Sequence, residues 1–66
     1  MELQPGFPIL AYVLIPNTNQ TTAIYGEYVG IAESGMCKVF WNDTGKYEER
    51  TTVDVMMMRK NYLKER

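Results

Sequence analysis

Apolar and polar positions along the chain group into short segments separated by turn-forming residues. The first segment, residues 9–15, is rich in β-branched and aromatic residues and lies between Pro8 and Pro16, which predicts a strand. Both of its alternating faces are apolar, so we expect this strand to be central or covered on both sides. A second, longer strand is predicted over residues 22–32, where Gly26 and Gly30 indicate bending, bulging or close backbone approach.

Two more strands are predicted on either side of the strongest turn signal in the chain. Residues 36–41 alternate between two faces, so Phe40 and the only tryptophan, Trp41, point in opposite directions. The sequence Asn42-Asp43-Thr44-Gly45 then predicts a four-residue hairpin loop in which Gly45 takes the left-handed position. Residues 46–53 form a polar alternating run, which is typical of a strand at the edge of a sheet.

The end of the chain allows two interpretations. The run VDVMMM, residues 53–58, fits a last short strand or a single helical turn, and residues 59–66 fit a frayed or helical tail. Five short strands with tight turns predict an all-β fold: a small five-stranded SH3-like barrel over residues 1–58, followed by a short basic C-terminal tail. Closure would bury both apolar patterns around one core and remove the sheet edges. A ββα arrangement with a C-terminal helix is the alternative.

The length of 66 residues limits the chain to one domain near the lower size at which a protein folds without metal or disulfides. Ordering each residue costs about 1.5 kcal/mol, so nearly every apolar side chain is expected in the core. Because nearly all apolar side chains are needed in the core, we expect no large active-site cleft.

The residue types argue against catalysis. The chain has no histidine and one cysteine, Cys37, which excludes a disulfide framework and a Cys/His zinc site within one chain. Cys37 lies in a strand-like run and is expected to be a small buried hydrophobe. Glu48 and Glu49 are adjacent in a strand and point to opposite faces, and no phosphate loop is present. We therefore expect no enzyme activity, no cofactor and no metal.

The start of the chain bears on its location. The first residues, MELQPGFP, lack the basic region of an export signal, and residues 9–15 are too short to span a bilayer. Together with the lone thiol, these features predict a cytoplasmic protein. The short chain suits a stand-alone accessory factor such as a phage or plasmid encodes.

Charge is distributed unevenly along the chain. Residues 1–58 carry seven acidic and three basic side chains, a net charge of −4, whereas residues 59–66 carry a net charge of +3. The acidic body argues against a broad phosphate-binding face. A small nucleic-acid-binding barrel remains the alternative function, with a tyrosine or Trp41 stacking on bases. Its basic contacts would be Lys38, Lys46, Arg50, Arg59, Lys60 and Lys64.

The segment YGEYVGIAESGMCKVFWNDTGKYEE, residues 25–49, resembles the middle hairpins of Tudor-type and related SH3-like domains. The resemblance lies in Tyr25, the turn at residues 33–35, Trp41, the D-x-G turn at residues 43–45, and Glu48. It implies a third function, a reader of methylated lysine or arginine, with Tyr25 and Trp41 in a cage that attracts a cation through aromatic faces. Thr44 stands where such domains often have another aromatic residue, and Lys46 would repel a bound cation.

The function we predict is a non-catalytic protein-interaction module, a small adaptor or regulator that binds a partner protein or itself as a homodimer. Exposed aromatic rings are frequent binding hot spots, and three consecutive methionines cannot all point into a core. The predicted partner-binding residues are Tyr25, Tyr28, Trp41, Tyr47, Met56, Met57 and Met58.

Overall fold

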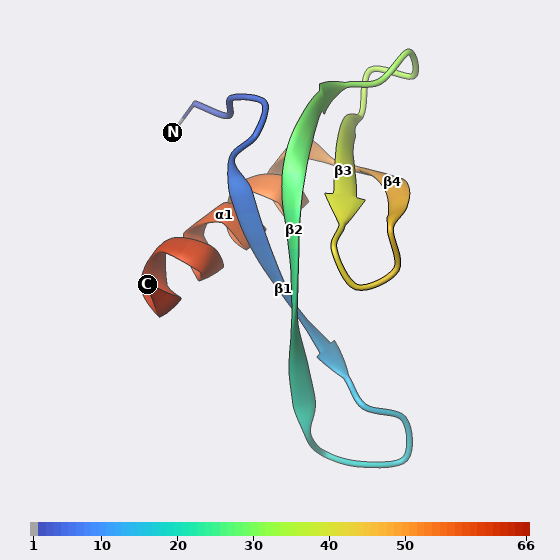
Figure 1. Cartoon of the computed structure of the whole chain (residues 1–66), viewed down its shortest axis with the longest axis vertical. Helices are drawn as coiled ribbons and strands as arrows, with labels where there is room; N and C mark the ends of the chain where they lie inside the picture. The colour runs from blue at the N-terminus through green and yellow to red at the C-terminus, as the bar shows by residue number, and fades with distance from the viewer. Residues whose placement is uncertain (1) are drawn as a thin grey trace.

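The chain folds into a four-stranded sheet followed by one helix. The computed structural model describes residues 2–66, which form β1 (Pro8–Leu14), β2 (Thr21–Ile31), β3 (Cys37–Trp41), β4 (Lys46–Arg50) and α1 (Thr52–Glu65). The strands pair antiparallel in chain order, β1-β2-β3-β4 (Figure 1). All four lie within the segments predicted as strands or one residue beyond them, because alternation and turn residues mark each one.

The predicted five-stranded SH3-like barrel is wrong. Among residues 2–66 no fifth strand forms, so the sheet stays open and the fold is α+β, mostly strand. The segment expected as the last strand begins a helix instead. Thr51 has an extended backbone, and its Oγ1 accepts a hydrogen bond from the Asp54 backbone N–H at 3.2 Å. This N-cap, the carboxylate in the first turn and the helix-favouring Met, Arg, Lys and Leu residues outweigh the strand preference of the two valines.

Helix α1 runs unbroken across residues 58 and 59, so residues 59–65 of the predicted basic tail form its second half and Arg66 is its C-cap. Val55 and Met58 are both buried, and together with the half-buried Tyr62 they follow the i, i+3, i+7 spacing of one helical face. In Figure 1, α1 crosses behind β2 and β1 and emerges beside β1. The C-terminal helix of the ββα alternative is therefore present, but four strands precede it instead of two.

One face of the sheet, called the covered face below, forms the core with α1. Register pairs place Ile9 opposite Gly26, and Tyr28 opposite Val39, on this face. Val55 and Met58 of the helix pack against these strands. The buried cluster consists of Ile9, Tyr28, Cys37, Val39, Trp41, Val55 and Met58. Cys37 is buried as predicted, with its Sγ 3.5 Å from Thr52 Oγ1.

Gly26 makes room for the indole ring of Trp41. The two residues are register partners, and a Cβ built on Gly26 would lie 2.8 Å from Trp41 Cε3 and collide with the Phe40 carbonyl oxygen. A side chain at position 26 would therefore displace either the ring or the strand. The register of β2 and β3 also shifts between Tyr28 and Gly30, which confirms the irregularity expected from the two strand glycines.

Helix α1 also covers the outer edge of β1. The guanidinium Nη1 of Arg59 donates a hydrogen bond to the Pro8 carbonyl at 2.9 Å, and Asn61 Nδ2 donates to the Leu10 carbonyl at 3.3 Å. The Arg59 guanidinium lies over the ring of Phe7, 4.2 Å from its centroid. These contacts give partners to carbonyl groups that an uncovered edge strand would leave to water.

The far half of the β1–β2 hairpin projects beyond the rest of the sheet (Figure 1). Strand β3 pairs with β2 from Gly26 to Ile31, so residues 12–14 and 21–23 pair only with each other, as a two-stranded ribbon. The molecule is accordingly elongated, with extents of 36 × 23 × 19 Å.

Candidate functional site: an aromatic face on the sheet

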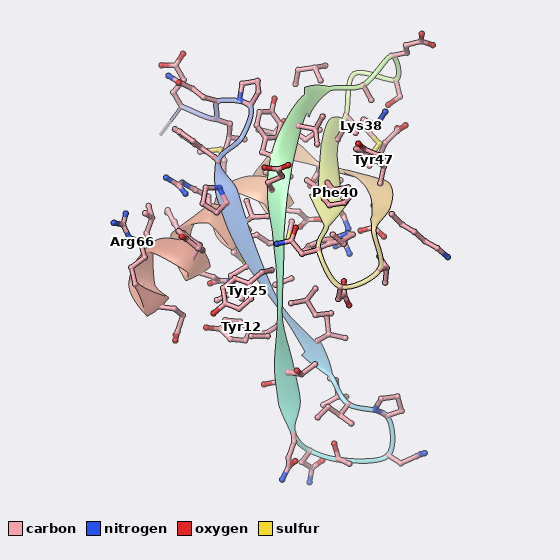
Figure 2. All side chains as sticks on the ribbon, viewed as in Figure 1. Tyr12, Tyr25, Lys38, Phe40, Tyr47 and Arg66 are labelled. Carbon is pink, nitrogen blue, oxygen red and sulfur yellow. The ribbon has the colours of Figure 1, made fainter. Side chains whose placement is uncertain are left out.

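The sheet presents aromatic rings on the face opposite the covered face. Tyr12, Tyr25, Phe40 and Tyr47 each come from a different strand, and each alternates with a neighbour on the covered face. Tyr12 is 48%, Tyr25 49% and Tyr47 60% exposed, and Phe40 is partly buried. We call these four residues the aromatic face. Figure 2 labels them together with Lys38 and Arg66.

One half of the aromatic face lies where the C-terminal end of α1 meets the ribbon. Tyr12 donates a hydrogen bond from its hydroxyl to Glu65 Oε1 at 2.8 Å. Tyr25 meets Tyr62 edge to face, with ring centroids 6.4 Å apart. A hollow of about 210 Å³ lies beside this pair, lined by Tyr25, Tyr62, Glu65 and Arg66. The hollow offers aromatic walls next to one carboxylate and one guanidinium.

The hydrogen bond to Glu65 also perturbs Tyr12. Because the neutral phenol donates to a carboxylate, the pKa of Tyr12 is raised above its usual value, and partial desolvation and the negative charge of Glu65 act in the same direction. Tyr12 therefore keeps its proton, and with it the contact between β1 and α1, at any physiological pH.

The other half of the aromatic face lies on β3 and β4. Phe40 and Tyr47 are register partners with ring centroids 5.1 Å apart. The ammonium of Lys38 lies over the Tyr47 ring, 4.9 Å from its centroid. Glu27 is the register partner of Phe40 on β2, so an exposed carboxylate lies beside Phe40 on this face. The face thus combines rings with charges of both signs.

The structure separates the predicted partner-binding residues. Tyr25 and Tyr47 lie on the aromatic face, whereas Tyr28 and Met58 are core residues of the covered side, 5% and 6% exposed. Burial raises the pKa of the Tyr28 hydroxyl. These two side chains hold the fold together and offer no area to a partner.

Trp41 belongs mainly to the core, with 9% of its surface exposed. Its indole Nε1 donates to Glu48 Oε1 at 3.1 Å, and Arg50 Nε donates to the same oxygen. These contacts, with the guanidinium as the largest cause, hold the pKa of Glu48 below its usual value. An edge of Trp41 borders an open groove of about 340 Å³ with an apolar floor of Ala11, Val13 and Ile24.

Met56 and Met57 lie on neither face of the sheet. Both are on α1, Met57 largely exposed on the side away from the sheet and Met56 half-buried. The methionines and the tyrosines therefore form two separate surfaces, not the single surface that the sequence suggested.

The basic residues of the nucleic-acid alternative are also dispersed. Lys38 lies beside Tyr47 on the aromatic face, while Lys46 and Arg50 alternate onto the covered side of β4. Arg50 pairs with Glu48, and Arg59 is occupied at the β1 edge. Lys60 and Lys64 are exposed on α1. No continuous track of cations joins these positions in the part of the chain that the structure describes.

The two positions implied for a methyl-cation cage do not meet. Tyr25 is on the aromatic face and Trp41 on the covered face, so their rings lie on opposite sides of the sheet. They cannot enclose one cation from two sides.

Sequence reasoning missed Tyr12 and Phe40 as members of the aromatic face, and Tyr62 as the helix residue that packs against Tyr25. Tyr12 lies in an apolar run that predicts burial on both faces, and the alternation of residues 36–41 places Phe40 and Trp41 on opposite faces without showing which face is buried. The signal was present in the alternation: once Trp41 is assigned to the core, Phe40 and Tyr47 must share the other face.

Comparisons with protein-family models, curated proteins and solved structures find no match. Within residues 2–66, no three His, Cys, Asp or Glu side chains group closely enough to hold a metal ion. No helix in the described part is long and apolar enough to cross a membrane.

Proposed function

We propose that this chain is a non-catalytic protein-interaction module that binds a partner protein through the aromatic face. The observation that carries the proposal is the exposure of Tyr12, Tyr25 and Tyr47 on one side of an open sheet. A chain of this size needs nearly all its apolar area for folding, so exposed rings gathered on one face are costly unless a partner covers them.

Ring chemistry and charge support a protein as the ligand. Tyrosine combines a large apolar area with a polar tip and only two side-chain torsions, so it loses little entropy on binding. The carboxylates of Glu27 and Glu49 share this face with the ammonium of Lys38. Two negative charges and one positive charge disfavour a phosphate backbone and suit a protein surface with both charge signs.

The test compares the Tyr25→Ser/Tyr47→Ser double variant with Ile31→Ser. Ile31 is also exposed but pairs with Cys37 on the covered side. Affinity capture from the source cell followed by titration of the purified partner should show a loss of about 2 kcal/mol or more in binding for the tyrosine variant. The control should bind as the wild type does. The free energy of unfolding should fall by about 1–3 kcal/mol in the tyrosine variant, which loses the ring contacts with Tyr62 and Phe40. It should change by less than about 1 kcal/mol in the control, and circular dichroism should show that both remain folded.

A partner that binds the tyrosine double variant as tightly as the wild type would refute the proposal. So would tight oligonucleotide binding that weakens steeply with salt, because it would identify the ligand as nucleic acid. A mass that rises with protein concentration, and is lowered by the tyrosine substitutions, would identify a second copy of the chain as the partner.

A further inference from the structure

The side of α1 that faces away from the sheet carries a stripe of apolar and basic residues. Positions 53, 57, 60 and 64 follow the helical spacing i, i+4, i+7, i+11 and therefore lie along one line. Val53 is 70% and Met57 59% exposed, and Lys60 and Lys64 are exposed as well. We call these four residues the outer stripe. It spans about 16 Å along the helix, from the rise of 1.5 Å per residue.

The apolar end of the outer stripe is hollowed. A depression of about 260 Å³ is lined by Val53, Met56, Met57 and Lys60. Methionine side chains are unbranched and flexible, so they can adapt the shape of this depression to an incoming side chain. An aliphatic or aromatic residue of a partner would fit there with the Lys60 ammonium at its side.

Charge along the outer stripe has one sign. In α1, which is described in full, the carboxylates are Asp54 and Glu65, each roughly 100–120° around the helix from Val53. Glu65 is also engaged with Tyr12. Among residues 2–66 the one ion pair joins Arg50 to Glu48, so Lys60 and Lys64 have no acidic partner among those residues.

We propose that the outer stripe binds an acidic amphipathic segment of a partner protein. Apolar side chains of that segment cover Val53 and Met57, and its carboxylates, one to two turns further along, pair with Lys60 and Lys64. This site is separate from the aromatic face and does not depend on the function proposed for it. Complementary charge supplies orientation, and the methionine-lined depression supplies apolar contact.

A membrane surface fits the outer stripe less well. Helices that lie in a bilayer interface carry their basic residues at the sides of an apolar face. Lys60 and Lys64 lie in the line of the stripe itself, so inserting Val53 and Met57 deeply would draw the ammonium groups into the apolar layer.

The experiment is an NMR titration of the full chain with two synthetic helical peptides. Both carry leucines on one face; the first has glutamates one turn away, and the second has lysines at those positions. The acidic peptide should shift amide signals of residues 53–64 and bind at least about tenfold more tightly than the basic one. Lys60→Glu/Lys64→Glu and Met57→Ser should each weaken binding of the acidic peptide, the charge reversal by about tenfold. Lys46→Glu, on β4, should leave its affinity unchanged.

Several results would overturn the proposal. These are absence of binding at millimolar peptide, equal affinity for both peptides, or signal shifts confined to the sheet. The proposal would also be overturned if Lys60→Glu/Lys64→Glu bound the acidic peptide as tightly as the wild type does, with circular dichroism showing that its helix is intact. Binding to phosphatidylcholine–phosphatidylserine vesicles that the acidic peptide does not displace would identify a membrane as the ligand instead. The Tyr25→Ser/Tyr47→Ser variant should titrate like the wild type, which separates this site from the aromatic face.

Discussion

Glu48 is the residue that connects the core tryptophan to the surface of β4. Its Oε1 accepts from both the Trp41 indole and Arg50, and its own side chain remains 44% exposed. The carboxylate therefore neutralises a guanidinium and fixes the orientation of a ring that borders the groove. A group in this position makes a small contribution to stability that depends on its charge state.

That dependence has a definite sign. The pKa of Glu48 is lower in the folded chain than its usual value near 4.5, so its ionised form stabilises the fold above that pH. The contribution is lost as the pH falls through the lowered pKa. In Glu48→Gln, the free energy of unfolding should therefore fall less between pH 7 and pH 3, by up to about 1 kcal/mol after allowance for solvent screening.

Urea denaturation followed by Trp41 fluorescence at several pH values measures this difference. Glu49→Gln removes the same charge from the opposite face of the same strand and is the matched control. If the curves of Glu48→Gln and Glu49→Gln coincide across the acid range, the contact with Arg50 and Trp41 contributes nothing measurable.

At the scale of elements, α1 covers the core and protects the edge of β1. A closed barrel would have achieved both by pairing its first and last strands. Val55 and Met58 cover the core, and Arg59 with Asn61 caps carbonyl groups on the β1 edge. The guanidinium of Arg59 also stacks on Phe7, so the contact combines a charge-assisted hydrogen bond with apolar and cation–π contact. These contacts protect the β1 edge of the open sheet.

Arg59→Ala should accordingly lower the free energy of unfolding by about 1–2 kcal/mol. Lys60→Ala, the next residue, is exposed and should change it by less than about 0.5 kcal/mol. Arg59→Lys should recover little, because an ammonium group lacks the planar stack on Phe7. Chemical denaturation of the three variants provides the measurement, and equal effects of the two alanine substitutions would contradict the role assigned to Arg59.

The sequence identifies the strands well and the last element poorly, for a physical reason. Alternation and turn chemistry are local, so residues 8–50 could be assigned from their own neighbours, including the left-handed Gly45 in the loop after Trp41. Residues 53–58 place apolar side chains on both faces of a strand and around most of a helical turn, so their pattern favours neither element. Their helical state depends on the Thr51 cap and on the spacing of Val55, Met58 and Tyr62, which is recognisable only when the following residues are included in the same element.

The candidate surface was predictable only in part. The predicted partner-binding residues include Tyr25 and Tyr47, which are exposed, and also Tyr28 and Trp41, which are buried. The pattern alone does not separate the two pairs, because the exposure of a ring depends on which face of the sheet the helix covers. That choice is made by packing between residues far apart in sequence, such as Ile9, Val55 and Met58, which belong to one buried cluster. A pattern of period two shows that two faces exist and cannot say which one is buried.

The whole molecule divides into a compact body and the projecting ribbon. The Tyr28 amide donates to the Phe7 carbonyl at 2.8 Å within the core, whereas Thr22 pairs with Val13 in the ribbon. Strand β3 does not pair with the ribbon, and α1 reaches it through the hydrogen bond between Tyr12 and Glu65 at its base. Beyond that contact the ribbon is two-stranded, and a two-stranded ribbon alone is only marginally stable in water. We therefore expect local opening of the ribbon to precede unfolding of the body.

Hydrogen exchange tests this division. The Thr22 amide should exchange at least about a hundredfold faster than the Tyr28 amide once both rates are corrected for intrinsic chemistry. Comparable protection at the two sites would mean that the ribbon and the body open as one cooperative unit. A partner that covers the ribbon would slow exchange at Thr22 specifically.

The position of α1 at the end of the strand order has a consequence for biosynthesis. Each strand can pair with the one made just before it, so the sheet can assemble while translation proceeds. Its apolar covered face nevertheless remains exposed to solvent, and the edge of β1 remains uncovered, until the 14 residues of the helix leave the ribosome. A nascent chain that stops at that stage should therefore be the form of this protein that chaperones bind most readily and that aggregates most readily.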